Sequence, residues 1–165
     1  MPMPGQLQAL LTYIRTHYEP ELHDLTERTI LGEAISAPLA ASDIAGYINQ
    51  KEQPSFHKLL FQIIDSRGLR DSYVYKKAGI DRRHFSKIRS NPHYQPSKPT
   101  VIAFCFALEL SFLEALNLLE SCGFSLSRSD RFDLAIRFFL ETGLYDLDTI
   151  NRLLDGAGIP SFIGV

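Results

Sequence analysis

Several features that often point to a function are scarce or missing in this 165-residue sequence. It has no tryptophan and only two cysteines, too few for the disulfide framework of a small secreted protein. The most apolar stretch, residues 101–110, is about half the ~18–20 residues that a membrane span requires. The first residues show neither the basic start nor the apolar run of an export signal. We therefore expect a cytoplasmic protein without membrane association, in which Cys105 and Cys122 are reduced, buried thiols.

Catalytic and metal-binding patterns are missing as well. No two of the histidines His57, His84 and His93 stand at the i, i+4 spacing, and no cysteine or carboxylate completes a ligand set around them. A Cys/His nucleophile pair stays open as an alternative, but no neighbouring residue indicates an activated thiolate. The sequence predicts neither an enzyme nor a bound metal or cofactor.

The apolar spacing is that of helices throughout. Apolar residues make up 45% of the chain and charged residues 22%, which suits one globular domain with a real core. No stretch alternates as a strand does, so the predicted fold class is all-α. Caps and stops define the expected helices, with Ser42 and Ser127 as expected N-caps of two of them. The ranges are residues 7–18, 24–35, 42–49, 56–67, 71–78, 82–90, 100–110, 111–123, 127–143 and 147–154.

The charge is small overall but unevenly distributed. The net charge is −2, yet residues 65–99 hold nine Lys/Arg against three acids, a local charge of +6. The residues before Gln53 carry −4, and those from Thr100 onward carry −5. A basic middle between acidic flanks is the pattern of a localised anion-binding face. An ordinary solvated face is the competing interpretation.

Residues 71–88, DSYVYKKAGIDRRHFSKI, follow the spacing of two helices joined by a tight turn. Gly79 supplies the positive φ that such a turn demands, and Asp81 can cap the second helix. Phe85 and Ile88 would anchor that helix on the core. At about 100° per residue, its opposite face carries Arg83, Ser86, Lys87 and Ser90. This is the spacing of a helix-turn-helix, whose second helix can enter a DNA major groove.

With that motif in place, residues 55–124 resemble the five-helix DNA-binding domain of the lambda-repressor-like (Cro-type) family. The resemblance includes the segment PSKPTVIAFCFALELSFLEALNLLESCGF, which is similar to the family's fourth and fifth helices. It implies a helix-turn-helix domain over residues 53–125, with helical extensions over residues 1–52 and 126–165. Tyr75 departs from the family pattern, because a small residue usually occupies that place. No glutamine opens either helix of the motif, and the loop at residues 91–96 is long.

A second resemblance covers more of the chain. DSYVYKKAGIDRRHFSKIRSN, YQPSK and SRSDRFDLAIRFFLETGLYDLDTIN are similar to a bacterial module that occurs alone or fused to macrodomain proteins. This resemblance keeps open a role as a protein–protein adaptor or sensor. The apolar stripe of Phe132, Ile136, Phe139 and Leu140 is expected to be core, with a dimer surface as the alternative.

These observations together predict a DNA-binding regulator. The expected ligand is double-stranded DNA, bound by a possible homodimer. The acidic flanking segments could mediate that pairing or contact another protein. The expected base-reading residues are Arg83, Ser86, Lys87 and Ser90. The expected phosphate-binding residues are Arg70, Lys76, Arg82, Arg89 and Lys98.

Overall fold

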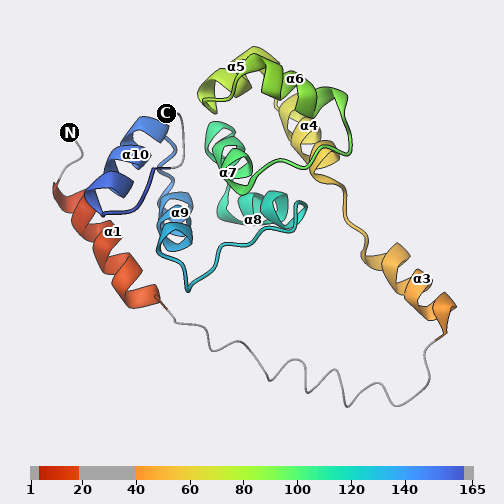
Figure 1. Ribbon diagram of the computed structural model, residues 1–165, viewed down its shortest axis with the longest axis horizontal. Coiled ribbons are helices and arrows are strands. Elements are labelled where there is room, and N and C mark those ends of the chain that lie inside the picture. The colour runs from red at the N-terminus through yellow and green to blue at the C-terminus, as the bar shows by residue number, and fades with distance from the viewer. Residues whose placement is uncertain (1–3, 19–39, 162–165) are drawn as a thin grey trace.

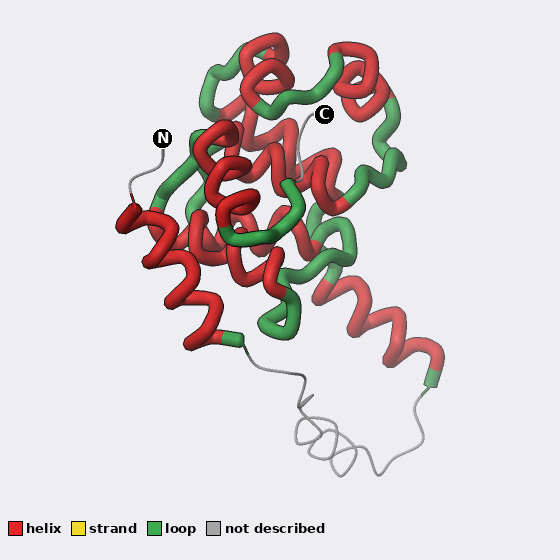
Figure 2. The backbone as a smooth tube through the Cα atoms, turned by 60° about the vertical axis from the view of Figure 1, so that its left-hand side comes forward, coloured by secondary structure: helices red, strands yellow, loops and turns green. Residues whose placement is uncertain are grey.

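The protein is described by a computed structural model covering residues 4–18 and 40–161. Within these residues every regular element is a helix, which confirms the predicted all-α class (Figure 2). The helix expected at residues 24–35 lies outside the described residues. No helix in the described part is long and apolar enough to cross a membrane.

Five helices in the middle of the chain form one group, with a nearly all-apolar helix at its centre. They are α4 (Phe56–Ser66), α5 (Asp71–Lys77), α6 (Arg82–Ser90), α7 (Lys98–Ala107) and α8 (Phe112–Glu120). Seven consecutive residues of α7, Val101 to Ala107, are buried, as its unbroken apolar run predicts. Helices α5 and α8 pack on α7, while α4 packs on both α6 and α8. The cluster holds α6 at one end of the molecule, at the top of Figure 1.

Helices from both ends of the chain form a second group. They are α1 (Pro4–His17), α9 (Arg131–Thr142) and α10 (Leu147–Gly156), which contact one another, and α9 also contacts α8 (Figure 1). Ile136 and Phe139 are fully buried, Leu140 is nearly so, and Phe132 is half-buried against the same core. That stripe is therefore core, as predicted, and not a dimer surface. The buried residues of both groups form one hydrophobic cluster.

Helix α3 (Ala41–Lys51) stands apart from both groups. It projects from the body ahead of α4, at the lower right of Figure 1, and none of its side chains is buried. The two described helices of the predicted extension over residues 1–52 therefore do not pack as one unit. Helix α1 packs on α9 and α10, whereas α3 does not pack on the core.

Two predicted caps were wrong, and both errors have the same cause. Helix α3 begins after Ala40, whose N–H donates to the Asp43 carboxylate at 2.9 Å, so Ser42 lies inside the helix. Helix α9 begins after Asp130, which accepts the Asp133 N–H at 2.8 Å, rather than at Ser127. In each case a nearby carboxylate satisfies a free N–H at the helix start, and a charged acceptor binds it more strongly than a hydroxyl. The predicted cap at Asp81 is confirmed, and Ser111 caps α8 through its side chain.

Candidate nucleic-acid interface

The turn between α5 and α6 has the geometry of a Schellman motif. Gly79 has φ +65°, its N–H donates to the Lys76 carbonyl at 3.1 Å, and the Ile80 N–H donates to the Tyr75 carbonyl at 2.8 Å. These bonds satisfy carbonyls that the end of α5 would otherwise leave unpaired. The predicted chain reversal at Gly79 is confirmed, and it brings α6 back against α5.

Helix α6 starts sharply because Asp81 caps it. One Asp81 oxygen accepts the N–H groups of Arg83 at 2.7 Å and His84 at 3.3 Å. An aspartate cap of this kind typically stabilises a helix by about 1 kcal/mol. The cap fixes the residue at which the helix begins.

Two apolar side chains hold α6 on the core. Ile88 is fully buried, and Phe85 is 3% exposed. The Phe85 ring lies 6.0 Å from the rings of Phe61 and Phe104 and 5.6 Å from that of Tyr75. Tyr75 is half-buried, so it joins the packing between α5 and α6 where a small residue was expected. The larger residue adds apolar contact at the crossing of the two helices.

The face opposite these anchors is open to solvent. Arg83, Ser86, Lys87 and Ser90 are all exposed, and their i, i+3, i+4, i+7 spacing places them on one stripe. The predicted base-reading set is therefore brought together on the outside of α6. Next to it, a shallow depression of about 430 Å³ runs between α5 and α6. Its lining includes Ser72, Tyr75, Arg82, Ser86 and Ser90.

Four of the nine cations in the basic segment are paired with acids. Arg67 donates to Glu114 at 3.2 Å and to the Leu108 carbonyl, and Lys77 pairs with Glu109 at 2.5 Å. Burial acts to lower the pKa of Lys77, but hydrogen bonds with Glu109 and Tyr73 outweigh it and raise that pKa. Lys98 pairs at 2.7 Å with Asp133, which is 4% exposed. Lys98 was expected on phosphate, and the structure assigns it an internal ion pair instead.

Arg89, also expected on phosphate, joins three helices. Its Nε lies 2.7 Å from an Asp71 oxygen at the start of α5, and its Nη2 lies 3.4 Å from Asp65 on α4. Its guanidinium carbon sits 4.3 Å from the centre of the Phe61 ring, and its backbone carbonyl contacts His57 Nε2 at 2.9 Å. Sequence reasoning missed this clamp, because its carboxylates lie 18 and 24 residues away.

The five other cations form no ion pair with any described residue. They are Arg70, Lys76, Arg82, Arg83 and Lys87, and all are exposed. Arg82, Arg83 and Lys87 lie on α6, and Arg70 is the N-cap residue of α5. Lys76 borders a different depression, which it shares with Asp146 and Asp148 of the α9–α10 region. The unpaired positive charge is therefore concentrated on α6.

Groups suited to covalent or metal chemistry do not gather anywhere in the described chain. No cluster of three His, Cys, Asp or Glu residues able to hold a metal ion occurs there. Cys105 and Cys122 are both buried free thiols. Burial raises the pKa of Cys122 to about 11, and it raises the pKa of Cys105 further. Neither thiol is activated as a nucleophile.

Comparison with family models, with curated proteins and with solved structures found no match to this chain.

Proposed function

We propose that the protein is a non-enzymatic regulator that binds double-stranded DNA, with α5, the Gly79 turn and α6 acting as a helix-turn-helix. The arrangement of α4–α8 supports assigning the five-helix Cro-type class to this core. In this proposal α6 lies in the major groove, which is wide enough to admit one helix. The N-terminus of α5 lies against the adjacent backbone.

The single observation that carries the proposal is where the neighbouring acids lie. Asp65 and Asp71 both contact Arg89, and the Asp81 carboxylate accepts backbone N–H groups at the start of α6. No carboxylate in the described structure neutralises Arg82, Arg83 or Lys87. A helix held by two buried residues and carrying three unopposed cations suits a polyanion as its partner.

Different side chains of α6 are assigned different roles. Arg82 borders the depression beside the exposed stripe, and Arg70 is the N-cap residue of α5; both can neutralise phosphates and fix the register of the helix. Arg83 and Lys87 stand on the stripe itself, where they can donate to guanine O6 and N7. Ser86 and Ser90 are short hydroxyl donors and acceptors on the same line, and serine accommodates either kind of base edge. Arg89 and Lys98 take no part, since their charges are already paired.

Fluorescence anisotropy with a random-sequence duplex at several salt concentrations tests the proposal. The intact chain should bind at low salt and release the duplex as salt rises. Arg83→Ala with Lys87→Ala should weaken binding strongly. Arg15→Ala with Arg152→Ala, which removes two exposed cations from α1 and α10, should leave binding unchanged. No binding at any salt concentration, or equal losses in the two double variants, would overturn the proposal in favour of the adaptor alternative.

Selection of preferred sequences from a random pool tests the base-reading roles. Arg83→Ala should relax the preference at one position, because a bidentate arginine–guanine contact contributes about 1–3 kcal/mol of discrimination. Arg82→Ala should lower affinity equally for all sequences. An unchanged preference in the Arg83 variant would remove Arg83 from the base-reading set.

A further inference from the structure

Helix α3 carries an apolar stripe that the body does not cover. Ile44, Tyr47 and Ile48 are 55%, 65% and 51% exposed, the spacing i, i+3, i+4 places them on one face, and Lys51 continues that face by one turn. Single exposed apolar residues are ordinary, but three on one face of a projecting helix form a patch. An amphipathic helix of this kind is typically stabilised by a groove into which its apolar face fits.

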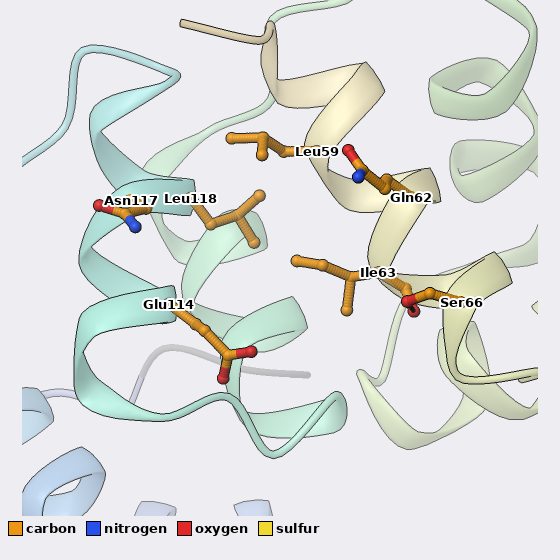
Figure 3. Close-up of a pocket in the computed structure, with 7 residues that line it drawn as sticks. All are labelled: Leu59, Gln62, Ile63, Ser66, Glu114, Asn117 and Leu118. Atoms are coloured by element: carbon orange, nitrogen blue, oxygen red, sulfur yellow. Dashed lines mark hydrogen bonds between the residues drawn. The ribbon is translucent and has the colours of Figure 1, made fainter.

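The same chain contains an apolar groove, between α4 and α8. It has a volume of about 270 Å³, and Leu59, Ile63 and Leu118 point into it from the two helices (Figure 3). Gln62, Ser66, Asn117 and Glu114 form its polar rim. Leu113, one turn before Asn117 on α8, is 68% exposed and extends the apolar surface along that helix. An apolar floor with a polar rim matches the two-sided character of α3.

The groove continues toward the base of α3. A second depression there is lined by Lys51, Gln53 and Pro54 on one side and by Asn117 and Glu120 on the other. Asn117 and Leu59 border both depressions, so the two adjoin. Glu120 forms no ion pair with any described residue, and Lys51 forms none either. A lysine at the end of the α3 stripe and a glutamate at the groove mouth are complementary in charge.

The linker directs α3 away from its own groove. Glu52 has φ −59° and ψ 123°, and Ser55 has φ −62° and ψ 159°, so both are extended. Pro54 restricts Gln53 to an extended conformation as well. These conformations do not turn the chain back on itself, and α3 points away from the body in Figure 1. A stripe that its own linker holds away from the groove is left available to the groove of a second copy.

From this geometry we infer that the protein forms a two-fold dimer by exchanging α3, each copy inserting Ile44, Tyr47 and Ile48 into the α4/α8 groove of the other. The interface is isologous, so one apolar stripe and one groove per chain are both filled. The α6 face takes no part in it, and the inference does not depend on the proposed function.

Light scattering coupled to size exclusion tests the exchange with the full chain. The intact protein should have twice the mass of one chain at micromolar concentration. Ile44→Glu with Ile48→Glu should weaken the dimer by roughly a hundredfold or more, since each substitution places a charge in the apolar groove of both copies. Ser42→Glu with Asn49→Glu, on the opposite face of α3, should leave the dimer intact. Because α3 buries no side chain in its own chain, neither variant should lose the helical content of the body.

Cysteine cross-linking separates exchange from other arrangements. A Tyr47→Cys chain mixed with an Asn117→Cys chain should form a disulfide-linked dimer on mild oxidation, and each variant alone should not. A monomeric intact protein, cross-linking of the Tyr47→Cys variant with itself, or an intramolecular disulfide in a chain carrying both substitutions would each overturn the inference. Each of these results would leave the DNA-binding proposal standing.

Discussion

Replacing Arg89 should cost stability rather than DNA affinity. Its side chain, 39% exposed, connects α4, α5 and α6 through Asp65, Asp71 and the Phe61 ring. Two exposed ion pairs contribute about 0.2–1 kcal/mol each, and a cation–π contact at an exposed site contributes about 0.5–1 kcal/mol. Arg89→Ala should therefore destabilise the fold by about 1–3 kcal/mol. That corresponds to a fall in Tm of roughly 2–10 °C for a domain of this size.

Arg89→Lys distinguishes the clamp from a phosphate contact. Lysine keeps the charge but lacks the planar fork that reaches two carboxylates and stacks on a ring. If Arg89 is a clamp, the lysine variant loses most of the same stability in thermal unfolding, and both variants keep the salt dependence of DNA binding. If Arg89 contacts phosphate, the alanine variant should flatten the log–log salt slope by about 0.9, as Arg82→Ala is expected to do. A stable lysine variant together with a flattened slope in the alanine variant would refute the structural role.

Three further predictions concern charge, pH and packing. With Arg70 and Arg82 on phosphates, the slope of log affinity against log salt should approach about −1.8 per chain, and a slope near zero would contradict this assignment. A hydrogen bond from the Ser111 backbone lowers the pKa of Glu114 below 4.5. As the pH falls, the Glu114 carboxylate is therefore protonated in the unfolded chain before it is protonated in the folded protein. Tm should therefore fall as the pH drops below about 4.5, and Glu114→Gln, compared with Asp155→Asn, should flatten that part of the profile. Phe85→Ala should cost about 3–5 kcal/mol in denaturant unfolding, whereas Tyr73→Ala, at a site 49% exposed, should cost less than about 0.5 kcal/mol.

Features set by neighbours in the chain could be predicted from the sequence. The Asp81 cap, the positive φ of Gly79 and the Phe85/Ile88 anchors each depend on residues within one or two turns. Together they fixed the phase of α6, and with it the exposed stripe from Arg83 to Ser90. The long apolar run of α7 likewise predicted its buried position. Local chemistry was sufficient wherever a single helix and its caps decided the outcome.

Features set by contacts between distant residues could not be predicted. Lys98 and Asp133 are 35 residues apart, and nothing near Lys98 in the sequence indicates that its charge is paired. The apolar stripe of α3 is a second feature whose surroundings could not be predicted. Its spacing is that of a helix buried on one side, yet none of its side chains is buried by the described part of the chain. Periodicity predicts that a face is apolar, but it does not identify the surface that will bury it.

The basic segment shows why counting charges is weaker evidence than locating them. Its +6 includes Arg67, Lys77, Arg89 and Lys98, each of which is paired with an acid, and three of those acids lie outside the segment. The same net charge of +6 would arise if the exposed cations of α6 were paired with acids and the four paired cations were left unpaired. Such a protein would be equally basic in sequence and would present no anion-binding face. What favours DNA as the partner is that folding pairs four cations of the basic segment with acids and leaves three unpaired ones, Arg82, Arg83 and Lys87, together on the exposed side of α6.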